Sequence, residues 1–196
     1  MVTYPIEQFE EWFKISGKWW TDDADLDNPI IHVQGDAKLK WTMPTNRLPY
    51  QFGEVSGNFD CHATVLKELT GCPTRVGGDF DAGWNLITNL TGGPKWVGGH
   101  YHVQECALLE NVQDVADHVG TTFRVGWRPS MHMMKPFMNS QKVILDRTPQ
   151  YSTWDDIHNM QLVQTVFDDH VGGGQGRVLQ VAYQLIKLGF TQTARM

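Results

Sequence analysis

Hydrophobic residues in the middle of the chain recur at a fixed spacing. Val55, Val76 and Val97 each lie 21 residues apart. The same step separates equivalent aromatic residues, leucines, glycines and prolines: Phe59, Phe80 and Tyr101; Leu69 and Leu90; Gly71 and Gly92; Pro73 and Pro94. One unit therefore reads V-x-G-x-F-D, a small or polar stretch, and L-x-x-L-x-G-x-P. Such a repeat is typical of a solenoid, in which stacked units bury the apolar face that one unit alone leaves exposed.

Weaker copies of the unit flank this central part. The segment Val33–Leu39 (VQGDAKL) precedes the Val55 copy by 22 residues, and Val119–Val125 (VGTTFRV) follows the Val97 copy by 22. These copies give five candidate rungs between about residue 33 and about residue 126. We expect one domain over residues 1–196, with an N-terminal cap over 1–30, a repeat solenoid over 31–127 and a helical C-terminal cap over 128–196.

Within each rung, apolar and polar residues alternate with the period of two that indicates a strand with one buried face. The alternation predicts two inward columns: Ala37, Phe59, Phe80, Tyr101 and Phe123; and Leu39, Cys61, Ala82, Val103 and Val125. It predicts three outward columns between them: Asp36, Asn58, Asp79, His100 and Thr122; Lys38, Asp60, Asp81, His102 and Arg124; and Lys40, His62, Gly83, Gln104 and Gly126.

The ends of the repeat need covers. Ile6 to Trp20 is rich in aromatic residues and is expected to form a helical N-terminal cap. After a Met-rich connector, SQKVIL is either a last strand or a short helix. Helical periodicity then predicts a hairpin of two helices, Thr153 to His170 and Gln175 to Gly189, separated by Gly172-Gly173-Gly174.

The chain resembles a known family of repeat proteins in two places. The units VSGNFDCHATVLKELTGCP and VGGDFDAGWNLITNLTGGP look like the leucine-rich-repeat-like proteins of tailed bacteriophages, and so does the ending GQGRVLQVAYQLIKLGFTQTARM. The resemblance covers roughly residues 27–196. It departs at Arg177, Thr193 and Met196, and in a fourth rung that lacks L-x-x-L-x-G-x-P. It implies an α/β repeat fold, a short leucine-rich-repeat-like solenoid with a parallel sheet of about five rungs, and an accessory phage protein made in the host cytoplasm that binds a host enzyme or defence complex.

Composition narrows the function classes. The formal net charge is -6 and the charges are interspersed, so no basic stripe favours direct binding to nucleic acid. No apolar run approaches the length of about 20 residues that spans a bilayer, and MVTYPIEQFEEWF lacks the features of a signal peptide. The three cysteines, Cys61, Cys72 and Cys106, form no CxxC pair and are expected to be free thiols in a reducing compartment.

The sharpest chemical hypothesis is a metal site. Stacked rungs bring His102 next to Asp81 and His100 next to Asp79, and imidazole and carboxylate groups at that spacing are able to hold a divalent metal. The alternative is that all four are exposed ladder pairs on a polar sheet face. No metal-specific motif such as H-E-x-x-H accompanies them.

Two other candidates have structural explanations. Cys61 and His62 are neighbours on one strand and point to opposite faces, so they do not form a nucleophile and base. The Gly-rich VGGGQGR at 171–177 lacks the Lys-Ser/Thr of a phosphate loop and is expected to be a turn. We therefore assign no catalytic residue and no cofactor.

These patterns favour a non-enzymatic module that binds a host protein and inhibits it by occlusion. The outward residues chosen as partner contacts are Asp60, Asp79, Asp81, His100, His102 and Arg124. The alternatives are a metal-dependent hydrolase that uses Asp79, Asp81, His100 and His102, and a virion or assembly component. The open ends of a solenoid also leave room for self-association.

Overall fold

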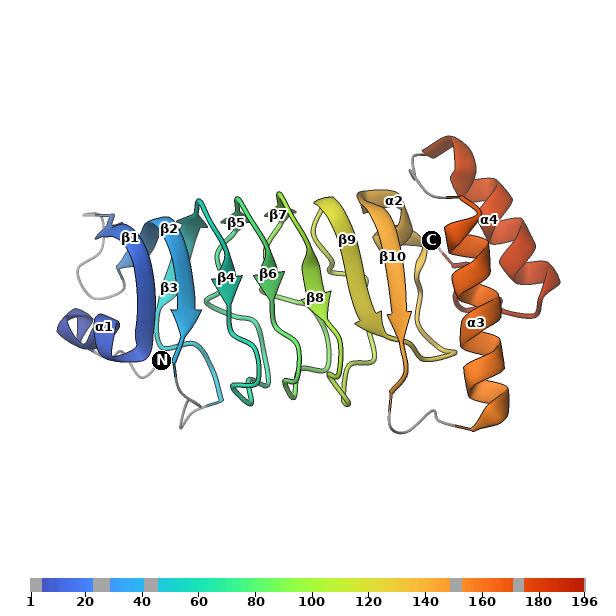
Figure 1. Cartoon of the computed structure of the whole chain (residues 1–196), viewed down its shortest axis with the longest axis horizontal. Helices are drawn as coiled ribbons and strands as arrows, with labels where there is room; N and C mark the ends of the chain where they lie inside the picture. Colours follow the sequence, from blue (N-terminus) through green and yellow to red (C-terminus); the bar gives the residue numbers. More distant parts are fainter. Residues whose placement is uncertain (1–4, 23–28, 41–45, 149–152, 171–174, 196) are drawn as a thin grey trace.

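The computed structural model describes residues 5–22, 29–40, 46–148, 153–170 and 175–195. Over these residues the chain is a parallel-sheet β-solenoid of about five turns with a few helices (Figure 1). Its elements follow in the order η1 (Ile6–Gln8), α1 (Phe9–Trp12), β1 (Phe13–Thr21), β2 (Ile30–Leu39), β3 (Gln51–Val55), β4 (Phe59–Asp60), β5 (Arg75–Val76), β6 (Phe80–Asp81), β7 (Trp96–Val97), β8 (Tyr101–Val103), β9 (His118–Gly126), α2 (Met134–Asn139), β10 (Ser140–Asp146), α3 (Trp154–Asp168) and α4 (Gln175–Lys187).

The sheet has two kinds of rung. The strands β2 and β9 are long and cross the full width of the sheet, whereas the three rungs between them are each divided into two short strands. These are β3 with β4, β5 with β6, and β7 with β8, and every pairing among them is parallel. All rungs lie side by side along the long axis of the molecule (Figure 1).

The inward columns are confirmed. Ala37 pairs with Phe59, Phe59 with Phe80, Phe80 with Tyr101, and Tyr101 with Phe123. All five side chains are buried, and the ring centroids of successive aromatic residues lie 6.0, 4.8 and 5.5 Å apart. A continuous aromatic stack therefore runs through the core and holds neighbouring rungs together.

Each divided rung bends where three consecutive backbone N–H groups point toward the preceding rung. In the rung of β5 and β6, the N–H groups of Gly77, Gly78 and Asp79 donate over 2.8, 2.8 and 2.7 Å. The first two reach backbone carbonyl oxygens, but the third reaches the side-chain oxygen of Asn58. In a regular strand the N–H groups of successive residues point to opposite sides. The bend therefore needs one acceptor that the backbone does not supply.

A row of Asx side chains supplies this acceptor. The Oδ1 atoms of Asp36, Asn58 and Asp79 each accept from an N–H one rung later, those of Asn58, Asp79 and His100, and every distance is 2.7 Å. The oxygen occupies the space beside the next rung, where a Cβ at Gly78 would lie 2.3 Å from Asn58 Oδ1. The glycine before each of these N–H donors is therefore a steric requirement of the Asx row.

We expect Asp79→Ala to lower the free energy of unfolding by about 1–3 kcal/mol, because the partly buried N–H of His100 loses its acceptor. Asp79→Asn keeps the Oδ1 oxygen and is the matched control, with an expected change within about 0.5 kcal/mol. Urea unfolding of both variants measures the difference. Equal losses in the two variants would show that the acceptor is not what stabilises the bend.

The predicted N-terminal helix over Ile6 to Trp20 is wrong beyond Trp12. The structure has only a short helical segment, η1 and α1, followed by β1, which pairs antiparallel with β2. Apolar and polar residues alternate along β1, and Gly17 has a φ of +118°, which no α-helix accommodates. Phe9 from α1 is fully buried, and its ring centroid lies 4.7 Å from that of Trp19, so this segment still covers the end of the core.

The C-terminal elements follow the sequence more closely. SQKVIL is a strand, since β10 adds a further parallel strand beside β9. The predicted helices are α3 and α4, and the Thr153 side chain forms a capping box with Asp156 at the start of α3. Both helices lie beyond β10 at the C-terminal end of the sheet (Figure 1). The connector methionines Met131, Met133 and Met134 are buried, in keeping with an adaptable core. Gly172 to Gly174 lie outside the described residues.

Candidate functional site

The outward face of the sheet carries three rows of side chains that run across the rungs. The middle row contains Asp36, Asn58, Asp79, His100 and Thr122. The charged row contains Lys38, Asp60, Asp81, His102 and Arg124. A third row, here called the stacked row, contains Trp20, His32, Glu54, Arg75, Trp96 and His118.

The middle row is largely committed to the scaffold. Asp79, which the sequence suggested as a partner contact, uses Oδ1 to accept from the N–H of His100. Thr122 at the end of the row is buried rather than exposed. Asp79 is therefore better understood as a structural residue, although part of its side chain reaches the surface. His100 contributes its backbone N–H to this row, and its side chain is also partly exposed.

The charged row is held by ion pairs between rungs. Lys38 Nζ lies 2.5 Å from Asp60 Oδ2, and Arg124 donates two hydrogen bonds to Asp146, over 2.6 and 2.9 Å. The hydrogen bond to Asp60 raises the pKa of Lys38, and the hydrogen bond to Asp146 raises the pKa of Arg124. The row is thus a surface of oriented charges whose long side chains are already partly fixed before any partner binds.

His102 lies between Asp81 and Arg124 in this row and, among the described residues, has no ion pair like those of Lys38 and Arg124. Its side chain is half-buried, and its ring centroid lies 5.4 Å from that of His100. Burial lowers the pKa of His102, the carboxylate of Asp81 opposes that effect, and the neighbouring His100 adds to it. His102 therefore favours its neutral form in the folded protein.

The lowered pKa of His102 predicts a pH dependence of stability. The unfolded chain, with an imidazole pKa of about 6.5, binds a proton more readily than the folded chain. His102 therefore contributes stability that is fully present above about pH 6.5 and is lost as the pH falls through the folded-state pKa. In urea titrations, the free energy of unfolding of the wild type should fall more between about pH 7.5 and about pH 5 than that of His102→Gln. Parallel curves for the two proteins would contradict the assignment.

The four residues of the metal hypothesis do not converge. Asp79 Oδ1 is bonded to the backbone, and the ion pair of Asp81 is with His62, whose Nδ1 lies 3.6 Å from Asp81 Oδ1. Among the residues that the structure describes, no group of three or more His, Cys, Asp or Glu side chains is placed to hold a metal ion. The prediction that Asp81 and His102 lie side by side on neighbouring strands is confirmed. Neighbouring positions alone, however, do not make two side chains converge on one metal ion.

The stacked row is the feature that the sequence analysis missed. The rings of Trp20 and His32 lie 5.5 Å apart and 12° from parallel, and those of Trp96 and His118 lie 5.2 Å apart and 14° from parallel. The guanidinium carbon of Arg75 lies 3.5 Å from the ring centroid of Trp96. This geometry combines ring stacking with a cation–π contact and fixes a row of flat polar groups at the surface.

Two shallow grooves lie at the N-terminal end of this face. One, of about 460 Å³, is lined by Trp20, Gln34, Glu54, Ser56 and Arg75. The other, of about 300 Å³, is lined by Lys14, Asp36, Lys38, Asn58 and Asp60. Both combine charged and polar groups with some apolar surface, which suits contact with side chains of another protein.

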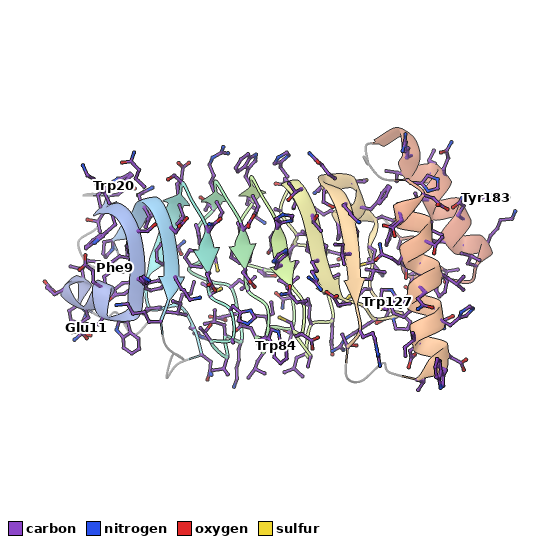
Figure 2. All side chains as sticks on the ribbon, in the orientation of Figure 1. Phe9, Glu11, Trp20, Trp84, Trp127 and Tyr183 are labelled. Carbon is purple, nitrogen blue, oxygen red and sulfur yellow. The ribbon has the colours of Figure 1, made fainter. Side chains whose placement is uncertain are left out.

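Two tryptophans stand at opposite rims of the face. Trp20 is 50% exposed and Trp84 is 57% exposed, at the top left and at the bottom of the molecule in Figure 2. Trp84 has a φ of +56°, a conformation shared by Ala63 and Glu105 at the equivalent positions of the neighbouring turns. A bulky residue is rarely found there, so the scaffold holds Trp84 outward in a strained turn.

The other sequence candidates are placed as follows. Cys61 is fully buried and His62 is exposed, as predicted from their positions on one strand. All three cysteines are free thiols and buried. Trp127 is buried and lies between the sheet and the C-terminal helices in Figure 2, whereas Trp41 lies outside the described residues.

Comparison with known proteins adds no relative: no family model, no curated protein and no solved structure matches the chain. Across the described helices, none combines the length and the apolar character that crossing a membrane requires.

Proposed function

We propose that this chain is a protein-binding module that uses the outward face of its sheet to bind and inhibit a host protein. One observation carries the proposal: the charged row and the stacked row are oriented by contacts between rungs, and the face has an exposed tryptophan at each rim, Trp20 and Trp84. Tryptophan and arginine are enriched among the residues that dominate protein interfaces.

The rigidity of the face favours binding by occlusion. Lys38 is paired with Asp60, Arg124 with Asp146, and Arg75 is stacked on Trp96, so less side-chain freedom remains to be lost when a partner binds. A neutral His102 between Asp81 and Arg124 adds a hydrogen-bond donor and an acceptor to the charged row without a further charge. The contact residues retained from the sequence are Asp60, Asp81, His102 and Arg124, joined by Trp20, Arg75, Trp84 and Trp96.

The resemblance to phage leucine-rich-repeat-like proteins is part of the same proposal. It is supported by the burial of the leucine-type pairs in successive rungs, which are Leu66 and Leu69, Ile87 and Leu90, and Leu109 and Val112. On this proposal the protein acts without catalysis in the host cytoplasm, and its target is a host protein that is inhibited during host takeover or that belongs to a defence system. The assignment of a leucine-rich-repeat-like solenoid explains the 21-residue spacing through stacking of one turn on the next.

The test is capture of a host protein from lysate on the purified chain, followed by an assay of the captured protein's own activity. Trp84→Ala and the pair Asp81→Lys with His102→Glu should each reduce capture by about 30-fold, the loss typical of a hot-spot residue. Trp154→Ala removes an 88% exposed tryptophan from α3 and is the matched control, expected to capture normally. The captured protein should lose activity as the wild-type chain is added.

Two results would contradict the proposal, one for the binding surface and one for the function. If the face variants capture the partner undiminished while Trp154→Ala does not, the binding surface lies on the C-terminal helices. If the chain is found as a fixed component of purified virions and captures no host protein, it is an assembly component rather than an inhibitor.

A further inference from the structure

The edge strands at the two ends of the sheet, β1 and β10, differ in how their outer backbone groups are hydrogen-bonded. At the C-terminal end, Gln164 of α3 lies against β10, where its Oε1 accepts from the N–H of Leu145 over 2.8 Å and its Nε2 donates to the carbonyl oxygen of Val143 over 3.0 Å. One amide side chain thus satisfies two groups of that strand. At the N-terminal end, β1 is the first strand of the sheet and has a strand partner on one side only.

The unpaired groups of β1 belong to its odd-numbered residues. The hydrogen bonds from Asp22 N to Ile30 O and from Lys40 N to Trp12 O, at 3.1 and 2.8 Å, extend the β1–β2 ladder at its two ends. Both involve even-numbered residues that directly flank β1, and the register between β1 and β2 is continuous. The backbone N–H and C=O groups of the even-numbered residues of β1 therefore point to β2, and those of the odd-numbered residues point away. Within the described part of the chain, these backbone groups have no hydrogen-bond partner; they belong to Ile15, Gly17, Trp19 and Thr21.

This open edge is not a straight strand. Gly17 has a φ of +118° and lies opposite Gly35, with a φ of +135°. A Cβ at Gly17 would lie 2.0 Å from the carbonyl oxygen of Gln34, and a Cβ at Gly35 would lie 1.6 Å from that of Ser16. The irregular residues of the two strands thus lie directly opposite each other, where two backbones approach closely. A strand added to the other edge must therefore also tolerate a glycine-type conformation opposite Gly17.

We propose that the occupant of this edge is β1 of a second copy, paired antiparallel about a two-fold axis at Gly17. Gly17 of one copy then lies opposite Gly17 of the other, so the two-fold symmetry itself places a glycine-type conformation opposite each Gly17. Ile15 lies opposite Trp19 of the other copy, and the free groups of residues 15, 17 and 19 form about six hydrogen bonds between the two chains. Each sheet continues into the other. The dimer interface shares one residue, Trp20, with the host-binding face proposed above, and otherwise consists of β1.

The side chains of β1 agree with this register. On the outward face, Lys14 lies opposite Trp20 of the other copy, which places an ammonium beside an exposed indole. Lys18 lies opposite Ser16, so no lysine faces a lysine directly. Edge lysines usually oppose indiscriminate strand pairing. In the pairing centred on Gly17, Lys14 and Lys18 face no lysine of the other copy. The same two lysines disfavour pairing with basic strands of other proteins.

A register-specific cross-link tests the proposal. In Lys14→Cys/Trp20→Cys, the two thiols of neighbouring copies form a non-hydrogen-bonded pair with Cα atoms about 4.5 Å apart, within disulfide range. Oxidised glutathione converts the two thiols to one disulfide and is itself reduced to two glutathione molecules. The native cysteines are at most 2% exposed and do not compete. The control Lys14→Cys/Lys18→Cys separates the thiols along a diagonal of about 7–8 Å and should cross-link at least tenfold less.

Sedimentation equilibrium of the unmodified chain supplies an independent readout. We expect a dimer at micromolar concentration that persists in Leu179→Glu/Tyr183→Glu, which places charges on an exposed apolar stripe of α4. Equal cross-linking of the two cysteine variants, a monomeric wild type, or a dimer lost on changing the α4 stripe would each overturn the proposal. Because the α4 variants leave β1 untouched, dimerisation through the helices is distinguished from dimerisation through the edge.

Discussion

Three consecutive backbone N–H groups that point toward the preceding rung determine the bend in each divided rung. The third of them has no backbone acceptor, so an Asx oxygen from one rung earlier accepts its hydrogen bond at 2.7 Å. That oxygen in turn requires a glycine beside it, which accounts for Gly57, Gly78 and Gly99 in the repeat. The row ends at His100, which carries no side-chain oxygen, and the next rung, β9, runs unbroken. The polar part of the repeat is therefore as much a folding requirement as its aromatic core.

This constraint divides the outward face into two kinds of surface. The side chains of Asp36, Asn58 and Asp79 in the middle row accept hydrogen bonds from the backbone. The charged and stacked rows on either side of it present their groups to solvent. Their side chains are oriented by contacts along the solenoid axis, such as Arg75 on Trp96 and Arg124 with Asp146. A face of this kind is suited to recognition by fixed shape and charge, in which little side-chain entropy is lost on binding.

The sequence predicted the parts of the fold that depend on repetition. The inward columns and the parallel register follow from the 21-residue spacing, because equivalent residues of stacked units must lie side by side. The function of Asp79 did not follow, since alternation shows that a residue points outward but not that its oxygen caps an amide in the next rung. The stacked row was missed because Trp20 and His32 precede the clear repeats and because the pairing of β2 with β3 shifts register between Ile31 and Val33. β1 was predicted as helix because its aromatic residues also suit an amphipathic helix, and only the conformation of Gly17 and the pairing with β2 decide for a strand.

Amide hydrogen exchange at Asn58, Asp79 and His100 is the most direct measurement of the central claim that the middle row belongs to the scaffold. These amides donate to Asx side chains rather than to backbone carbonyl groups, so without those side-chain oxygens they would be open to solvent. Protection comparable to that of the neighbouring strand amides of Phe59 and Phe80 is the predicted result. Exchange as fast as in an exposed loop would contradict the account, because the middle row would then be a free surface and the glycines beside it would need another explanation.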